Sequence, residues 1–354
     1  MFLFGIPSPW YSELSNEIGV VPAYFLITFI AIVPGFMNAF VFMANVFDVR
    51  PPELDDQRYP PVSVLIAAYN EIFAITSTLT SLFNQSYSSP MRIILISDGS
   101  YDLTVDVVRE IEKKHPNLEL IYLQHNGGKA AALNLGLEKC KTDIVISVDA
   151  DCYLHRDGIK NLVSRYWADP LDTRAVAGSI LIRNSRENWI TKAQEWDYFL
   201  GIGTVKRIQS LFHGGTLVAQ GAFSLYDRKA LVEMGGWPEK VGEDIVLTWK
   251  FLSAGYRVGY AQDAMAFTNC PNMLEQFIKQ RRRWSRGLME AFKECPMILF
   301  KPRLTTLYIW WNTMFPLMDI AYTFGFIPGL ILACFGKFSI VGPMTLSFAD
   351  GIFA

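Results

Sequence analysis

The sequence has few charged residues, and its positive charges are almost absent from both ends. Charged residues make up 19% of the 354 residues and hydrophobic residues 51%, whereas soluble domains carry about 25% charged residues. No Lys or Arg precedes Arg50, and only Lys337 follows Arg303. The net charge of −2 excludes the strongly basic domain that bulk nucleic-acid binding requires. We therefore expect no nucleic-acid partner, and a charged middle between two apolar ends.

The N-terminal apolar stretch is long enough to cross a membrane. Residues 18–47 contain no charged side chain, and a membrane-spanning helix needs about 20 apolar residues. The preceding residues 1–17 hold two glutamates but no Lys or Arg, so they lack the positive start of a secretory signal peptide. Because the basic residues all follow the apolar stretch, the positive-inside rule predicts an N-terminus outside the cell membrane and a cytosolic charged middle.

A second apolar region follows the charged middle and has two interpretations. Residues 304–336 contain a single charged side chain, Asp319. Since a carboxylate in hydrocarbon is costly, Asp319 either lies at the membrane surface or lines a functional pathway. The aromatic cluster of Tyr308, Trp310 and Trp311 favours the membrane surface, where such side chains are enriched.

These boundaries predict five segments. They are an extracytoplasmic N-terminus (1–17), a transmembrane helix (18–47), a linker (48–61), a cytosolic domain (62–303) and an interfacial or transmembrane region (304–354).

Several motifs that define other classes of protein are missing. No two of the five cysteines have CxxC spacing, and the four histidines are isolated, so the local sequence offers no zinc site. Neither GxxxxGK[ST] nor a GxGxxG turn after a strand occurs. These absences exclude a P-loop nucleotide hydrolase and a dinucleotide-dependent dehydrogenase.

The charged middle begins with alternating strand and helix patterns. Apolar, β-prone runs lie at 62–68, 93–97, 118–123 and 144–148, and helical compositions lie between them at 72–84, 103–114 and 128–139. This alternation predicts an α/β fold, with a mostly parallel sheet covered by helices on both faces. In open sheets of this kind, ligands bind beyond the carboxyl ends of the strands.

Each predicted strand ends in polar residues. Asp149 and Asp151 follow the fourth strand, and their spacing places both carboxylates on one side of an extended backbone, where they can share a hard cation such as Mg²⁺ or Mn²⁺. The alternative is a pair of turn-forming carboxylates. Because Asp98 and Lys129 follow two neighbouring strands, the metal site is favoured.

A glycine turn after the third strand suits a diphosphate. In Asn126-Gly127-Gly128-Lys129, the glycines expose backbone N–H groups, a helix follows, and the lysine supplies a positive charge. A nucleoside diphosphate held by Lys129, with a metal on the two aspartates, is the ligand that this edge of the sheet best accommodates.

Two later segments carry further candidates. Glu243 and Asp244 open a predicted helix, where a carboxylate either caps the helix or serves as a general base for a hydroxyl. Farther on, Gln280 begins a helical segment with three consecutive arginines and Trp284. These arginines either bind an anion or face solvent and lipid headgroups.

The motifs form a recognisable series. In order they are Tyr69-Asn70-Glu71, Asp98-Gly99-Ser100, Gly128-Lys129-Ala130, Asp149-Ala150-Asp151, Gly242-Glu243-Asp244 and Gln280-x-x-Arg283-Trp284. From about Pro61 to Phe292 this series resembles the processive family 2 glycosyltransferases, such as the poly-N-acetylglucosamine, chitin-oligosaccharide, hyaluronan and cellulose synthases. It looks most like the bacterial poly-N-acetylglucosamine synthases. Gly242 stands where several relatives have Thr, a change that we expect to matter little.

The resemblance implies a GT-A-like fold flanked by transmembrane helices, and a role for each motif. For the donor, Tyr69, Glu71 and Asp98 would hold the uridine, Lys129 and Arg283 would hold the diphosphate, and Asp149 would hold the ribose or sugar. Asp151, with Asp149, would ligate Mg²⁺ or Mn²⁺. Asp244 would be the catalytic base, and Glu243, Gln280 and Trp284 would contact the acceptor.

The implied function is a membrane-bound inverting β-glycosyltransferase that extends an extracellular polysaccharide from a UDP-sugar, with UDP-N-acetylglucosamine as the expected donor. Single-sugar transfer to a lipid or short acceptor is the alternative, and a non-catalytic membrane scaffold is a third. Expected partners are the donor, a growing glycan or lipid acceptor, and membrane lipids. Because relatives continue with more membrane helices whereas this chain stops at Ala354, we also expect a small membrane partner subunit, self-association or a truncated gene.

Overall fold

The computed structural model describes residues 8–48, 59–212, 214–337 and 340–341. The chain divides into two compact units, Asp48–Leu307 and a second unit formed by Met1–Phe47 with Tyr308–Ala354. The expected N-terminus (1–17), linker (48–61) and C-terminal region (304–354) lie partly outside the described residues, which omit 1–7, 49–58 and 342–354.

The larger unit is built on one eight-stranded sheet in the order β3-β2-β1-β4-β7-β6-β8-β5. Its strands are β1 (Val62–Ala68), β2 (Met91–Asp98), β3 (Leu118–Leu123), β4 (Ile144–Asp149), β5 (Tyr153–Leu154), β6 (Thr173–Ile182), β7 (Phe223–Asp227) and β8 (Arg257–Thr268). Strands β1 to β4 pair in parallel, β7 runs antiparallel to β4 and β6, and β6 is parallel to β8. The predicted α/β class is therefore confirmed, and the later strands add antiparallel pairs to it.

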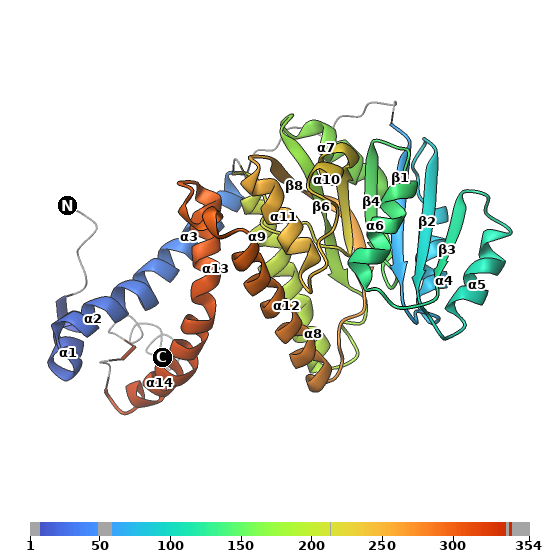
Figure 1. The fold of residues 1–354 in the computed structure, drawn as a ribbon. Coiled ribbons are helices and arrows are strands. Elements are labelled where there is room, and N and C mark those ends of the chain that lie inside the picture. Colours follow the sequence, from blue (N-terminus) through green and yellow to red (C-terminus); the bar gives the residue numbers. More distant parts are fainter. Residues whose placement is uncertain (1–7, 49–58, 213, 338–339, 342–354) are drawn as a thin grey trace. The chain divides into compact units, whose positions relative to one another are not determined.

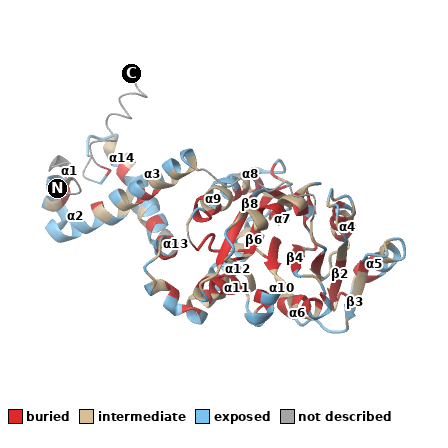
Figure 2. Cartoon of the chain, turned by 90° about the horizontal axis from the view of Figure 1, so that it is seen from above, coloured by how far each residue is buried: buried red, intermediate tan, exposed pale blue. Residues whose placement is uncertain are grey.

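Helices cover both faces of this sheet (Figures 1 and 2). They are α4 (Ile75–Phe83), α5 (Thr104–Glu112), α6 (Lys129–Lys139), α7 (Gly158–Ala168), α8 (Trp189–Trp196), α9 (Val205–Gln209), α10 (Arg228–Glu233), α11 (Glu243–Ser253) and α12 (Leu274–Glu294), with a π-helical segment at Asp197–Thr204 and a 3-10 helix at Pro296–Phe300. Figure 2 shows α4 and α7 on one face and α6, α10 and α11 on the other. The central strands are buried on both sides, which explains their continuous apolar runs.

The second unit is helical, and its helices after α1 (Ser8–Ile18) are apolar. Its elements are α1 (Ser8–Ile18), α2 (Val20–Leu26), a π-helical segment (Ile27–Ile32), α3 (Val33–Val46), α13 (Leu304–Ala321, which begins in the larger unit), a π-helical segment (Tyr322–Phe326) and α14 (Ile327–Ala333). Within the described residues, one continuous helical stretch, Val20–Val46, is long and apolar enough to cross a membrane, and Leu317–Ala333 is a shorter apolar stretch.

Candidate active site

The parallel register brings the polar ends of three strands together at one edge of the sheet. Ala67 of β1 pairs with Asp149 of β4, and Ala68 pairs with Ser97 of β2, one residue before Asp98. Glu71 follows β1 closely enough that burial, together with the charges of Asp151 and Asp149, raises its pKa to about 7. The predicted clustering of these side chains at the carboxyl edge is therefore present.

Asp98 holds the glycine turn in place. It is 3% exposed, and its carboxylate oxygens accept hydrogen bonds from the backbone N–H groups of Gly127 and Gly128 at 2.7 and 2.8 Å. Gly128 has a φ of +91°, a conformation that glycine adopts without strain. Both oxygens of Asp98 are thus engaged within the chain, and its expected contact with uridine stays a prediction.

Lys129, the first residue of α6, connects carboxylates from two distant parts of the chain. Its Nζ lies 2.5 Å from Asp149 Oδ1 and 3.3 Å from Glu243 Oε1. Burial disfavours the charged form, but Asp149 and Glu243 outweigh burial and raise the pKa of Lys129. Gly221 leaves room for this contact, because a Cβ at that position would lie 2.6 Å from Lys129 Nζ.

Asp151 is the better-placed candidate for a metal ligand. Burial, and then the neighbouring Asp149 charge, raise the pKa of Asp151, a repulsion that a bound cation would relieve. Its Oδ2 accepts a hydrogen bond from the Thr268 hydroxyl at 3.2 Å. Among the described residues, no three His, Cys, Asp or Glu side chains are grouped so that they could hold a metal ion. A metal here would take its remaining ligands from waters or other oxygen donors, as Mg²⁺ bound by one or two carboxylates commonly does.

Helix α12 fixes the start of α11. The Oε2 of Glu290 accepts hydrogen bonds from the backbone N–H groups of Val241 and Gly242 at 2.8 and 3.3 Å. Gly242 and Gly287 pack backbone against backbone, since a Cβ on Gly242 would come within 2.5 Å of the Gly287 Cα. These contacts position the carboxylates of the first turn of α11.

Asp244 lies in that first turn, after the N-cap residue Gly242. Its Oδ2 accepts a hydrogen bond from the Gly221 N–H at 3.2 Å, and its Oδ1 one from the Ile245 N–H at 2.8 Å. Gly221 therefore contacts Asp244 and also adjoins the pair formed by Lys129 and Glu243. Asp149, Lys129, Glu243 and Asp244 form one charged cluster, which we call the carboxylate–lysine cluster.

The remaining predicted residues are not joined to this cluster by any hydrogen bond or ion pair between described residues. On α12, Arg283 is exposed and Gln280 is half-buried. The Trp284 ring lies 6.0 Å from the Tyr198 ring and 4.4 Å from the Arg281 guanidinium. Tyr69 is 45% exposed, and its ring meets Tyr101 edge-on.

One buried lysine near the site carries no signal in the sequence. Lys206 of α9 is 7% exposed, and burial lowers its pKa to about 7, although the negative charge of Asp244 favours the protonated form. A single lysine next to Arg207 in the apolar segment 199–212 carries no motif. Its burial depends on tertiary packing, so local pattern could not have distinguished it from a surface lysine.

Comparison with known proteins identifies the domain. Residues 63–235 match the model of the family described as Glycosyl transferase family 2. This match covers the strands β1 to β4 together with the glycine turn and the two aspartates. Residues 63–235 therefore match a family 2 glycosyltransferase domain, as the motifs predicted.

The chain is also similar to two curated relatives and to one solved structure. It is 33% identical over 261 residues to poly-beta-1,6-N-acetyl-D-glucosamine synthase of Staphylococcus aureus (strain COL), covering 73% of this chain and 62% of the relative. It is 32% identical over 256 residues to the synthase of the same name from Staphylococcus epidermidis, covering 72% and 61%. The chain thus spans somewhat less than two thirds of their length.

The fold resembles that of a mannosyltransferase from Pyrobaculum calidifontis, solved in complex with GDP-Man and Mn²⁺. The TM-score is 0.60 at 22% identity, over 72% of this chain and 71% of that one. This likeness bears on the fold alone, and it confirms the expected GT-A-like architecture.

Proposed function

We propose that this chain is a membrane-bound inverting β-glycosyltransferase that extends an extracellular polysaccharide from a UDP-sugar, with UDP-N-acetylglucosamine as the donor. The observation that carries the proposal is the carboxylate–lysine cluster, in which Lys129 contacts Asp149 at 2.5 Å and Glu243 at 3.3 Å. The 33% identity to a poly-beta-1,6-N-acetyl-D-glucosamine synthase supports the choice of donor and product.

In this proposal the donor diphosphate lies against the glycine turn. The turn is held by Asp98, and Lys129 follows it directly, so positive charge is fixed where negative charge develops on the leaving group. Asp151 and Asp149 would hold Mg²⁺ or Mn²⁺ together with phosphate oxygens, and that ion would offset the charge of the departing UDP.

Asp244 acts as the general base. The acceptor hydroxyl oxygen forms a bond to the sugar anomeric carbon, the bond from that carbon to the UDP oxygen breaks, and the hydroxyl proton passes to the Asp244 carboxylate. The Gly221 N–H holds one Asp244 oxygen at 3.2 Å and so fixes the orientation of the carboxylate. Gln280, Glu243 and Trp284 meet the acceptor, while Arg283, Tyr69 and Glu71 contact the donor.

The proposal places the catalytic domain in the cytosol. The helical stretch Val20–Val46 has a mean hydropathy of 2.2 in its most apolar window, and the basic residues begin after it at Arg50. By the positive-inside rule, the N-terminus then lies outside. A reporter fused before Ile18 that is active in the cytoplasm would contradict this orientation.

A panel of radiolabelled UDP-sugars, incubated with membranes that contain the protein, tests the donor and the product together. A long labelled glycan formed from UDP-N-acetylglucosamine supports the proposal. A product one sugar longer than the acceptor would instead identify a single-sugar transferase acting on a lipid or short acceptor. Absence of both transfer and UDP release would leave the scaffold alternative.

A further inference from the structure

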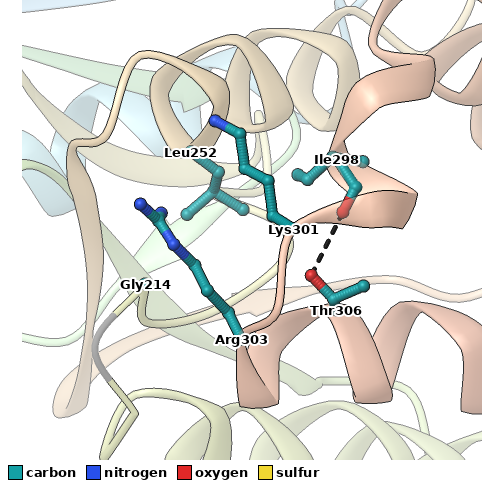
Figure 3. A pocket seen from close by; sticks show the side chains of 6 residues that line it. All are labelled: Gly214, Leu252, Ile298, Lys301, Arg303 and Thr306. Carbon is teal, nitrogen blue, oxygen red and sulfur yellow. Dashed lines mark hydrogen bonds between the residues drawn. The ribbon is translucent and has the colours of Figure 1, made fainter.

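A small pocket in the larger unit lies outside the candidate active site. Figure 3 shows its lining, which consists of Gly214, Leu252, Ile298, Lys301, Arg303 and Thr306. None of these residues belongs to the carboxylate–lysine cluster. They come from the loop before β7, from α11, from the 3-10 helix, from the junction that leads into α13 and from the first turn of α13.

The charge of this lining is entirely positive. Lys301 and Arg303 contribute two cations, and the lining contains no carboxylate. The two side chains extend in the same direction from the chain (Figure 3). An anion that enters the pocket would therefore meet two positive charges without opposition from an acidic side chain of the lining.

The two cations differ in how far they are already engaged. Lys301 Nζ donates a hydrogen bond to the Ser253 carbonyl at 2.6 Å, which leaves it further donor capacity. For the Arg303 guanidinium, the described part of the chain offers no hydrogen-bond or ion-pair partner. An arginine with a free planar fork of N–H donors is suited to two oxygens of a phosphate group.

The remaining lining is largely apolar and buried. Leu252 and Ile298 present apolar side chains and are both buried. The Thr306 hydroxyl donates to the Ile298 carbonyl at 3.1 Å, and its oxygen is left as an acceptor.

The pocket also occupies a particular place along the chain. Lys301 and Arg303 are the last basic residues before the apolar region, and helix α13 begins at Leu304. Trp310, which is 48% exposed, follows within its first turns, and such aromatic side chains are enriched at the headgroup level of membranes. Basic residues at this position commonly meet anionic lipid headgroups.

We propose that the pocket formed by Lys301, Arg303 and Thr306 binds a phosphate group, contributed by an anionic phospholipid headgroup. The phosphate oxygens accept hydrogen bonds from the Arg303 guanidinium and the Lys301 ammonium. Through this contact the catalytic domain is held to the lipid surface at the start of α13.

Native mass spectrometry of the full chain in neutral detergent tests the proposal, with phosphatidylglycerol, phosphatidylcholine and inorganic phosphate as the three probes. We expect one phosphatidylglycerol to bind more tightly than phosphatidylcholine, and millimolar inorganic phosphate not to displace it. Each basic residue removed should weaken phosphatidylglycerol binding about fivefold. We therefore expect a loss of about fivefold for Arg303→Gln and about 25-fold for Lys301→Gln/Arg303→Gln.

The matched control removes two positive charges elsewhere. Arg109 and Lys113 are 55% and 67% exposed, so Arg109→Gln/Lys113→Gln should bind the lipid like the wild type. Lys301 also bonds to the Ser253 carbonyl, so the double variant loses a contact within the chain. If the double variant melts at a lower temperature for that reason, lipid binding by Arg303→Gln alone tests the proposal. Equal lipid binding by wild type and Arg303→Gln overturns the proposal, and so does tight binding of inorganic phosphate without any preference for phosphatidylglycerol.

Discussion

Gly242 and Gly287 lie in direct backbone contact, so that a Cβ built on Gly287 would come within 2.8 Å of the Gly242 Cα. This contact joins the first turn of α11 to the middle of α12. Since Glu243 and Asp244 directly follow Gly242, their positions depend on how closely the two helices approach. Gly242 stands where several relatives have Thr, and here its missing side chain permits the approach.

Gly287→Ala should therefore disturb both stability and turnover. The added Cβ meets backbone atoms, which cannot rotate away, and overpacking of this kind costs about 1–3 kcal/mol. We expect the melting temperature to fall by several degrees and turnover to fall with it, because Asp244 is displaced. Gly203→Ala is the control, as its Cβ would have only ordinary contacts at 3.5 Å or more. Wild-type melting and turnover for Gly287→Ala would contradict this account of the helix contact.

The sheet could be predicted from the sequence because its central strands are buried on both faces. Such strands appear as continuous apolar runs, and the run at 62–68 coincides with β1. The polar strand ends were likewise visible, and parallel pairing places Asp149 beside the end of β1. Local pattern and strand topology were sufficient for this half of the site.

The other half depends on contacts between segments far apart in the chain. Gly221 adjoins Lys129 and contacts Asp244 although 92 and 23 residues separate them, and no local pattern indicates such an approach. The burial of Lys206 likewise follows from tertiary packing. The bonds from the Gly127 and Gly128 N–H groups to Asp98 also join separate segments, and the expected contact of Asp98 with uridine stays a prediction.

Asp98→Asn tests the support of that turn. The amide would retain one acceptor oxygen but would place an N–H₂ group against the N–H of Gly127 or Gly128, and an unmade buried hydrogen bond costs about 1–3 kcal/mol. We expect donor binding, measured by calorimetry, to weaken by about 5- to 100-fold. Asp227 caps α10 by accepting from the Ala230 N–H at 2.8 Å, so Asp227→Asn is the control and should bind the donor normally. Unchanged donor binding by Asp98→Asn would mean that the turn does not hold the diphosphate.

Asp151→Asn tests the metal site. If Asp151 ligates the cation, the substitution removes one charged oxygen ligand, and transfer should fall by about 10²–10³-fold, as on removal of an electrostatic stabiliser. Circular dichroism should show an intact fold. Transfer by the wild type should also stop in EDTA and return with Mg²⁺ or Mn²⁺. Thr268→Val is a milder comparison, because it removes only the hydrogen bond to Asp151 at 3.2 Å. Full wild-type activity in EDTA would rule out the metal site.

Lys206→Met should stabilise the protein in a pH-dependent way. Burial lowers the pKa of Lys206 from 10.5 to about 7 in the folded chain. Between these values the unfolded state binds more protons, so wild-type stability rises with pH from about 7 to 10.5. The advantage of Lys206→Met should therefore be largest below pH 7, up to ~5 kcal/mol, and shrink above it.

Thermal melts of wild type and Lys206→Met from pH 6 to 10 measure this advantage. Titratable groups that both proteins share contribute equally, so they cancel in the difference between the two stabilities. Lys139→Met removes an exposed lysine at the end of α6 and should leave the difference flat. A constant gap between Lys206→Met and wild type across this range would show that the buried lysine does not titrate there.

Asp244→Asn distinguishes a catalytic base from a structural carboxylate. Asp244 accepts hydrogen bonds from the Gly221 and Ile245 N–H groups at 3.2 and 2.8 Å, and Asn can keep one of these contacts with one oxygen. If Asp244 is only structural, the enzyme should therefore lose little activity on this substitution. If Asp244 is the base, it must take the proton of the acceptor hydroxyl, which an amide cannot do. Turnover at saturating donor should then fall by about 10²–10⁴-fold, with little change in donor binding. Glu243→Gln is the comparison, because it breaks the contact with Lys129 at 3.3 Å and should also alter donor binding. Near-normal turnover by Asp244→Asn would transfer the role of base to another carboxylate, with Glu243 the next to test.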